Sequence, residues 1–473
     1  MLSSEHWIKM RYKILFLPIE TKNREFLGKL LTAVKATDRN WLVFLGQAKN
    51  VRKVLPGFLP GVYSEISIPE YKYGSHLLLL SQAGHKIVNI CEESVTYPDG
   101  KDYCDRKVGE KSLGLTEIFF ASGKRHAKDV AKFRDINPDQ LPITGSNRMD
   151  ILRFGYRDVY APMAKEINDR LGSFILVNTN FARCNPHPNY GNRLAGLQKK
   201  NVISDSNQVK IWQGSHDYKA KLMTEFMDFI PDLASRSDCK VVVRPHPSEN
   251  HEVWNNWAEA YKDVLIQHEG SANEWMMAAK ATIHNGCTTG LEGFVLERPV
   301  IAYVPDPSND FSKNIANQVS HQVNTKDELL ETVDRALQTG CLDSGEKRRV
   351  KTGKLKYYID NVDGPLAAER IVEELDTLDV PFHSLEDILK RATQISSSRT
   401  FLFSGCRSFL KKGVKMLKGN NKDKLSKVLQ KFPGLAEDEI MESLLIWKQQ
   451  GLLSTVPSVT KIQDNFFCLY NEK

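Results

Sequence analysis

The sequence predicts an α/β protein with two doubly wound domains, each built on a parallel sheet between helices. From the first residues to about residue 380, short β-rich apolar runs alternate with longer helical patterns, which is typical of βαβ units. The chain has 473 residues, which is more than a single hydrophobic core usually supports, so two or three domains are expected. With 41% hydrophobic and 26% charged residues, the composition is that of a water-soluble globular protein.

The strands are expected where β-branched or aromatic runs are bounded by turn residues. In chain order they are 12–17, 41–45, 86–90, 118–120, 141–143, 174–178, 240–243, 281–284 and 300–303. The helices are expected where apolar residues recur every three or four positions, at 23–34, 75–82, 218–233, 272–280, 289–296 and 326–337. The stretch 185–214 is rich in Asn, Pro, Gly and Ser, and predicts a loop.

This pattern divides the chain into three parts. We expect one Rossmann-like domain at residues 1–170 and a second at 171–380, with a basic helical extension at 396–473. The segment 155–172 is expected to carry the chain from the first domain to the second.

Composition excludes several classes of protein. The longest apolar runs, such as 77–80 and 174–177, are far shorter than the roughly 20 residues that span a bilayer. The first residues lack the cleavage site of a secretory signal, and the eight cysteines include no Cys-x-x-Cys pair. We therefore expect a cytoplasmic protein in a reduced compartment, without a zinc ribbon.

Positive charge is concentrated in one segment. Residues 390–431 hold twelve lysines and arginines against Asp423 alone, a net charge of +11, whereas the whole chain carries +7. The apolar residues of one helical stripe in this segment are Leu402, Cys406, Phe409, Leu410, Val414 and Leu417. The basic residues of the other side are Arg407, Lys411, Lys415 and Lys418. Such a helix can bind the anionic inner-leaflet membrane surface, and a solvated helix packed on the protein would show the same pattern.

The strongest local motif is ATIHNGCTTGLEG, in which a strand, a turn containing Asn285 and Gly286, and a helix starting near Thr289 follow one another. Backbone N–H groups and the positive end of a helix dipole favour an anion there, and Thr288 and Thr289 add hydroxyl donors. Glu292, expected in the first helical turn, can accept hydrogen bonds from a ribose diol. A well-capped helix with glycines for close packing gives the same pattern.

A second motif is VVVRPHP, an apolar strand that runs into Arg244, a proline turn and His246. A histidine at the carboxyl end of a strand can donate a proton to a leaving phosphate, and Arg244 can neutralise an anion or hold the loop. Pro247 helps to fix the backbone around His246. An ordinary exposed histidine in a proline turn is the alternative.

Two adjacent carboxylates, Glu92 and Glu93, follow the strand expected at 86–90. Successive side chains of an extended chain point to opposite sides, so only one of the two can enter a site as general base. Either one can do so, and a pair of surface acids is a frequent explanation for Glu-Glu.

Other polar residues are expected at the carboxyl ends of strands, where open α/β sheets place their ligands. They are Glu20, Arg24, the segment 144–150, Asn178 and Asn180. Turn formation also accounts for Asn, Gly and Ser at such places. The sequence holds no Gly-x-Gly-x-x-Gly, Walker loop, Asp-x-Asp or spaced His/Cys set, so we expect no metal and no cofactor.

These residues together resemble the surface carbohydrate biosynthesis family of bacterial glycosyltransferases, which have the GT-B fold of two facing Rossmann-like domains. The resemblance runs over residues 12–378, and its most specific segments are RPHPSEN, HEGSANEW, HNGCTTGLEGFVLERPVIAYVP, ILVNTNF and ITGSNRMD. The same pattern is similar, more distantly, to bacterial sialyltransferases, Kdo transferases and CDP-glycerol glycerophosphotransferases.

The more distant relatives hold a cytidine nucleotide with a His-Pro element and a Ser/Thr pair, which match residues 246–247 and 288–289 here. An acidic pair followed by Gly supplies the base in the sialyltransferase-like enzymes. It corresponds to residues 92–93, but Ser94 stands where those enzymes have Gly.

The resemblance implies a metal-independent glycosyltransferase of surface polysaccharide biosynthesis. The second domain would bind a nucleotide-sugar donor, with a CMP-activated acidic sugar preferred and CDP- and UDP-linked donors open. The first would bind a glycan or lipid-linked glycan acceptor, and the enzyme would attach peripherally to the inner membrane. Thr288, Thr289 and His246 would stabilise the leaving phosphate, and Glu92 or Glu93 would deprotonate the acceptor.

Three other hypotheses remain. A UDP-sugar 2-epimerase-like enzyme shares the two-domain fold and a similar Gly-rich turn, and a CDP-polyol phosphotransferase shares the cytidine elements. The +11 segment also suggests a nucleic-acid binder, whose affinity would fall steeply with salt. We expect no nucleic-acid partner.

Overall fold

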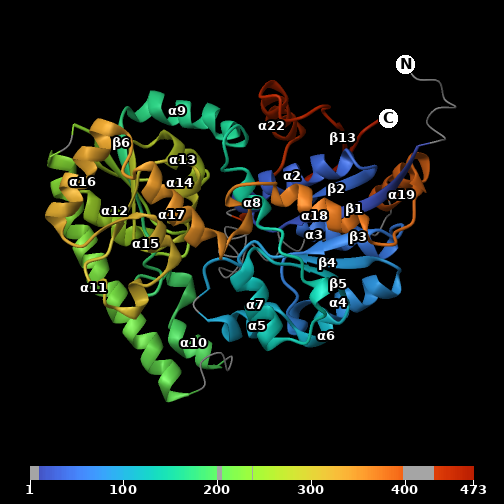
Figure 1. Cartoon of the computed structure of the whole chain (residues 1–473), viewed down its shortest axis with the longest axis horizontal. Coiled ribbons are helices and arrows are strands. Elements are labelled where there is room, and N and C mark those ends of the chain that lie inside the picture. Colours follow the sequence, from blue (N-terminus) through green and yellow to red (C-terminus); the bar gives the residue numbers. More distant parts are fainter. Residues whose placement is uncertain (1–9, 98, 200–204, 237, 398–430, 473) are drawn as a thin grey trace, which may run out of the picture. The chain divides into compact units, whose positions relative to one another are not determined.

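The computed structural model describes residues 10–97, 99–199, 205–236, 238–397 and 431–472. They form two α/β units, and Figure 1 labels many of their helices and strands. Unit 1 consists of Met1–Val159 and Lys356–Lys473, and unit 2 of Tyr160–Leu355. Unit 2 is therefore an insertion in the sequence of unit 1.

Unit 1 contains a sheet of eight strands in the order β13-β14-β2-β1-β3-β4-β5, with β12 paired to β1. The strands are β1 (Arg11–Ile19), β2 (Trp41–Gln47), β3 (Val62–Glu65), β4 (Lys86–Ile90), β5 (Thr116–Phe120), β12 (His383–Ser384), β13 (Ser458–Gln463) and β14 (Phe466–Tyr470). Strands β2, β1, β3, β4 and β5 are parallel, whereas β12, β13 and β14 pair antiparallel.

Both faces of the unit 1 sheet are covered. On β1, Ile14 and Phe16 join a core with Val51 of α3 and Leu77 of α4, while the alternate residue Leu15 is equally buried on the other side. The helices of unit 1 are α2 (Lys22–Thr37), α3 (Ala48–Val54), α4 (Glu70–Gln82), α5 (Gly100–Lys107), α6 (Glu110–Leu113), α7 (Lys124–Phe133), α8 (Asn147–Asp150), α18 (Ala367–Asp376), α19 (Leu385–Ser397) and α22 (Glu437–Gln449).

Residues beyond 355 return to unit 1, whereas the predicted second domain ran to residue 380. The reason is Asp150 at the end of α8, whose carboxylate accepts hydrogen bonds from the backbone N–H groups of Ala367 and Ala368 at 3.0 and 2.9 Å. This contact caps α18, which packs against α2.

The last described residues extend the sheet of unit 1 with β13 and β14, where the sequence predicted a basic helical extension at 396–473. Asn465 takes a left-handed conformation (φ 63°) in the turn between β13 and β14, and the Phe466 ring stacks on Phe44 at 5.5 Å. Gly46 of β2 is required here, because a Cβ would lie 2.3 Å from the carbonyl oxygen of Asn465.

Unit 2 contains a parallel sheet of six strands in the order β11-β10-β9-β6-β7-β8. The strands are β6 (Phe174–Asn178), β7 (Lys240–Arg244), β8 (Val264–Ile266), β9 (Ala281–His284), β10 (Val300–Tyr303) and β11 (His321–Val323). Its helices are α9 (Ala161–Leu171), α10 (Arg193–Lys199), α11 (Ser206–Arg236), α12 (His251–Ala258), α13 (Ala272–Ala278), α14 (Thr288–Val295), α15 (Ile315–Val319), α16 (Lys326–Thr339) and α17 (Gly345–Lys356).

The predicted fold class, two Rossmann-like units with parallel sheets, is confirmed. Two local expectations differ. Residues 141–143 form only a single bridge, Ala121 with Ile143, and 185–214 contain α10 and the start of α11. The basic amphipathic stripe falls on 398–430, outside the described residues. Where the structure describes the chain, no helix is long and apolar enough to cross a bilayer.

Candidate functional site

The strand order of unit 2 reverses between β6 and β9. The chain moves from β6 through β7 to β8 in one direction and then returns to place β9 on the other side of β6. Asn178, the last residue of β6, is in register with Arg244 of β7 and His284 of β9. Ligands of open α/β sheets bind outside the carboxyl ends of the strands at such a point, so these three ends define the candidate site of unit 2.

The turn from β9 to α14 is shaped by His284 and two glycines. Nδ1 of His284 accepts the N–H of Gly286 at 3.0 Å, and Nε2 lies 2.7 Å from the hydroxyl of Ser320. Burial lowers the pKa of His284 to about 3, so the ring is neutral and structural. Gly286 has a φ of +85°, and a Cβ on Gly290 would lie 2.5 Å from the His284 ring.

The start of α14 carries the predicted threonines. The helix begins at Thr288, and both Thr288 and Thr289 are half-buried in its first turn. Cys287 precedes them as the N-cap without a side-chain cap, and its Sγ lies 2.5 Å from Oγ1 of Thr289. Glu292 is buried in the second turn rather than the first, because the helix begins one residue earlier than expected.

Two buried amides flank the reversal point. Asn285 is 3% exposed, and neither its amide nitrogen nor its oxygen has a partner among the described residues. The amide nitrogen of Asn178, which is 4% exposed, also has none within that part of the chain. Unpaired buried polar groups cost about 1–3 kcal/mol each, so this site is poised for a polar ligand. Asn180 lies half-buried two residues beyond Asn178.

His246 is held by the buried carboxylate of Glu249. Glu249 is fully buried and accepts four hydrogen bonds, from the backbone N–H groups of His246 and Phe181, the hydroxyl of Thr179 and the indole of Trp254. The ring Nδ1 of His246 accepts the N–H of the next residue but one, at 3.1 Å. A neutral ring therefore carries its proton on Nε2, where it is a hydrogen-bond donor.

Arg244 holds a loop, which is one of its two predicted roles. Its guanidinium donates to the carbonyl oxygens of Glu269 and Gly270 at 2.6 and 3.3 Å and lies 5.1 Å from the Trp275 ring centroid. These contacts tie the guanidinium to the loop that precedes α13. Pro247 is exposed.

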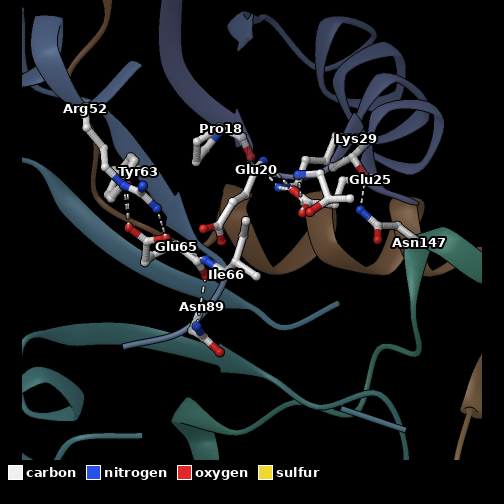
Figure 2. Close-up of polar contacts among 12 residues, drawn as sticks. Pro18, Glu20, Glu25, Lys29, Arg52, Tyr63, Glu65, Ile66, Asn89 and Asn147 are labelled. Atoms are coloured by element: carbon white, nitrogen blue, oxygen red, sulfur yellow. Dashed lines mark hydrogen bonds and ion pairs between the residues drawn. The ribbon is translucent and has the colours of Figure 1, made fainter. Parts of the chain in front are cut away.

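Unit 1 has its own reversal point, between β1 and β3. Figure 2 shows the Lys29 ammonium between the carbonyl oxygen of Pro18 and the carboxylate of Glu25, which lies 2.9 Å away. Glu25 also accepts the backbone N–H of Glu20 at 2.9 Å. The Glu20 side chain is half-buried, with Lys72 at 3.7 Å.

The end of β3 is built on Glu65, which is fully buried. Its carboxylate accepts from the Arg52 guanidinium at 2.6 Å and from the Tyr63 hydroxyl at 2.6 Å (Figure 2). The amide nitrogen of Asn89 donates to the carbonyl oxygen of Glu65, which leaves the amide oxygen of Asn89 without a partner in the described chain.

Asn147, like Asn89, presents an amide oxygen as a hydrogen-bond acceptor. Its amide nitrogen donates to the Thr32 hydroxyl at 3.1 Å, and that hydroxyl donates to the carbonyl oxygen of Gly28. The amide oxygen of Asn147 has no partner among the described residues. Because both amide nitrogens are fixed against acceptors, Asn89 and Asn147 present oxygen atoms, which suit a ligand that donates hydrogen bonds.

Glu92 and Glu93 have opposite surroundings. Glu92 is 5% exposed, neither of its oxygens has a partner in the described chain, and burial raises its pKa to about 7 although Lys29 acts to lower it. Although burial acts to raise the pKa of Glu93, Lys107 and Arg24 hold it at about 2, with ion pairs of 2.6 and 2.5 Å. Glu92 is thus a carboxyl group that can exchange a proton near neutrality, whereas Glu93 is a fixed anion.

The structure adds residues that sequence inspection missed. Lys219 contacts the turn before α14, Glu249 orients His246, and Glu25, Lys29 and Glu65 build the end of the unit 1 sheet. Lys219 falls on the same helical stripe as buried apolar residues of α11, and that unusual position was a usable signal. Across the described ranges, no group of three or more His, Cys, Asp or Glu is arranged to hold a metal ion.

No protein-family model and no curated protein matches the sequence. Several solved structures are similar in chain path. The wall teichoic acid polymerase TagF, solved with CDPG, shares 11% identity over 82% of this chain and 91% of its own, with a TM-score of 0.43.

UDP-GlcNAc 2-epimerase of Methanocaldococcus jannaschii, in complex with UDP-GlcNAc and UDP, shares 12% identity over 77% of this chain and 99% of its own, with a TM-score of 0.45. Another UDP-N-acetylglucosamine 2-epimerase shares 12% identity over 79% and 98%, with a TM-score of 0.47. Similarity at this level identifies neither the substrate nor the reaction of this chain.

Proposed function

We propose that the chain is a GT-B glycosyltransferase that moves a sugar from a nucleotide donor to a glycan or lipid-linked glycan acceptor. The observation that carries the proposal is the set of polar groups at the β6–β9 reversal point of unit 2. There the amide nitrogen of Asn178 and the amide of Asn285 have no partner among the described residues, and α14 begins without a side-chain cap. A phosphate ester suits this arrangement, since helix N-termini and amide donors both bind anions.

In the proposed reaction, unit 2 stabilises the leaving phosphate. As the bond from the sugar to the phosphate breaks, negative charge develops on the phosphate oxygens, and the N–H groups at Thr288 and Thr289 stabilise it by donating hydrogen bonds to these oxygens. Because Nδ1 of His246 accepts a backbone N–H, the ring carries its proton on Nε2, from which it donates a hydrogen bond to the departing phosphate oxygen.

Glu92 is the proposed general base. A base with a pKa of about 7 is ionised in part at neutral pH and can still hold the proton that it removes from the acceptor hydroxyl. Glu93 is too strongly paired with Lys107 and Arg24 to take this role. The amide oxygens of Asn89 and Asn147 are acceptors for the other hydroxyl groups of the acceptor sugar.

The preferred donor is a CMP-activated acidic sugar, and CDP- and UDP-linked donors are the nearest competitors. The preference rests on the match of residues 246–247 and 288–289 to the elements that hold cytidine in sialyltransferase-like enzymes. We place the reaction in the cytoplasm, at the inner face of a membrane, and expect it to need no metal.

The test is a thermal-shift screen with CMP, CDP, UDP and GDP, followed by an assay of nucleotide release in the presence of EDTA. A nucleotide that binds the native state raises the melting temperature. The proposal predicts one preferred nucleotide, and its release only when the matching donor and a glycan acceptor are both present. A chain that shifts with none of the four contradicts it.

The same assay separates the alternatives. An epimerase would convert the donor sugar without any acceptor. A CDP-polyol phosphotransferase would release CMP while moving a polyol phosphate. In the proposed transferase, the sugar itself appears on the acceptor, which mass spectrometry of the product detects.

A further inference from the structure

Lys219 lies beside the turn that leads into α14. Its ammonium donates to the carbonyl oxygen of Asn285 at 2.8 Å and lies 5.9 Å from the centre of the Phe181 ring. On the helix, Lys219 shares a stripe with Leu222 and Phe226, which are 2% and 0% exposed. A cation on this stripe is directed toward the sheet rather than toward solvent.

The charge of Lys219 is not neutralised at contact distance. Among the described residues it has no ion pair, and its hydrogen bond goes to a neutral carbonyl oxygen, which leaves two of its three N–H donors for a ligand. Burial lowers the pKa of Lys219 to about 8, although Cys287, Cys184 and Glu249 act to raise it. By contrast, the fully buried Lys29 has the carboxylate of Glu25 at 2.9 Å.

Glu249 does not supply the missing partner. Both of its oxygens are occupied by Thr179, Phe181, His246 and Trp254. The two cysteines near Lys219 are protonated at neutral pH, because burial raises the pKa of Cys184 to about 11 and also raises that of Cys287. Arg183, another described residue that acts on Lys219, is a cation and lowers its pKa further.

Two other side chains at this turn also offer hydrogen-bond donors that have no partner among the described residues. Asn178 has an unpartnered amide nitrogen, Asn285 has an unpartnered amide group, and α14 begins without a side-chain cap. Asn285 is adjacent to the glycine that starts the turn into α14. The Lys219 ammonium donates to the carbonyl oxygen of Asn285, so it lies beside this turn. A cation with several donors and no counter-charge calls for an anion.

We propose that Lys219 binds the phosphate of the donor, together with Asn178, Asn285 and the backbone N–H groups at the start of α14. The inference rests on the proposed function and adds to it the residue that supplies the positive charge. The class of ligand is a phosphate or diphosphate ester.

The test compares Lys219→Met with Lys221→Met, a matched control two residues along α11 whose side chain is exposed. Calorimetric titration with inorganic pyrophosphate should show binding to the native chain, at least tenfold weaker binding to the Lys219 variant, and binding within twofold of native for the Lys221 variant. Equal affinity of the Lys219 variant and the native chain, or no pyrophosphate binding by the native chain, would overturn the assignment.

A second measurement uses the unmodified protein and does not depend on how the variant folds. Lysines are acetylated by limiting acetic anhydride at pH 8, with and without pyrophosphate, and are quantified by mass spectrometry. Pyrophosphate should slow the modification of Lys219 at least fivefold and leave Lys221 unchanged. No protection of Lys219 would contradict the assignment.

The two proposals fail separately. If pyrophosphate binding depends on Lys219 but the chain transfers no sugar from any nucleotide, the anion site is supported and the proposed function is contradicted. If the Lys219→Met variant transfers sugar with an unchanged KM for the donor, the proposed function is supported and the role of Lys219 is contradicted.

Discussion

Glu249 accepts a hydrogen bond from the backbone N–H of His246 at 3.1 Å, so a fully buried carboxylate fixes the turn that presents the imidazole. The same carboxylate ties this turn to the segment after β6 through Thr179 and Phe181. The carboxyl ends of β6 and β7 are therefore joined by one side chain.

Replacing Glu249 with Gln should destabilise unit 2 by about 1–3 kcal/mol, because an amide nitrogen would face N–H groups that now meet a carboxylate oxygen. Thr179→Val removes one of the four bonds and should cost about 1 kcal/mol. Urea unfolding followed by circular dichroism measures both. A Glu249→Gln protein as stable as the native chain would show that these bonds do not hold the turn.

Glu92→Gln should reduce sugar transfer by at least about a hundredfold, since it removes the general base. In the native enzyme, kcat/KM should rise as the pH increases through about 7, where Glu92 loses its proton. A pH–rate profile that is flat between pH 5.5 and 8.5 would exclude Glu92 as the base.

The Glu92→Gln variant should also be more stable than the native chain at alkaline pH. The pKa of Glu92 is raised from 4.5 to about 7, so the folded state holds this proton more tightly than the unfolded state, and stability is lost as the pH rises through 7. Glu92→Gln should therefore be more stable than the native chain at pH 8, by up to about 3 kcal/mol, and similar to it at pH 4.

The control is Glu93→Gln, for which the sign is opposite. The pKa of Glu93 is lowered to about 2, so its contribution to stability is present above 4.5 and is lost as the pH falls through 2. Its loss should destabilise the protein modestly at pH 8. If both substitutions changed the stability at pH 8 in the same direction, the opposite surroundings described for Glu92 and Glu93 would be refuted.

Replacing Thr288 and Thr289 with Val should weaken nucleotide binding at least tenfold while the fold remains intact. The measurement is calorimetry with the nucleotide that the thermal-shift screen selects. Thr325→Val is the control, because Thr325 caps α16 elsewhere in unit 2 and its loss should cost about 1 kcal/mol of stability without changing nucleotide affinity. Unchanged affinity in the double variant would refute an anion site at α14.

Phe466→Ala should destabilise unit 1 by about 3–5 kcal/mol, since the ring is 1% exposed and stacks on Phe44. Phe154, which is 83% exposed, serves as the control, and Phe154→Ala should change stability by less than about 0.5 kcal/mol. Thermal unfolding of both variants tests whether the hairpin is part of the unit 1 core. Equal melting temperatures would show that it is not.

Deleting residues 396–420 should release the protein from vesicles containing anionic lipids, because the basic stripe predicted there supplies the attraction. Co-sedimentation with anionic and with neutral vesicles measures the effect. Undiminished co-sedimentation of the deletion variant would contradict the membrane role.

Local sequence pattern was sufficient for the strands that carry the site. β6, β7 and β9 are apolar runs ending in polar turns, so the strand-end rule pointed to Asn178, Arg244 and Asn285. β3, β8 and β11 were missed because they have only three or four residues, and β3 and β11 also mix polar with apolar residues. β14 was missed for another reason, since its partner β2 lies more than 400 residues away and no local pattern reports that pairing.

The chemistry of the site was harder to predict than its position. Glu92 and Glu93 are adjacent in the sequence, but only the fold brings Lys107 and Arg24 to Glu93. It leaves the carboxylate of Glu92 without a hydrogen-bond partner among the described residues. Lys219 was one lysine among many until α11 placed it at the turn before α14. Contacts between residues far apart in the sequence determine both the surroundings of the two glutamates and the position of Lys219.

The insertion of unit 2 into unit 1 sets an order for assembly during translation. Residues 160–355 leave the ribosome as one uninterrupted stretch and can fold at once, whereas β2 waits for β14, which is made more than 400 residues later. Until then the outer edge of β2 offers unpaired backbone groups to any passing strand. A nascent chain stalled before residue 466 should therefore be a preferred client of chaperones that shield such edges.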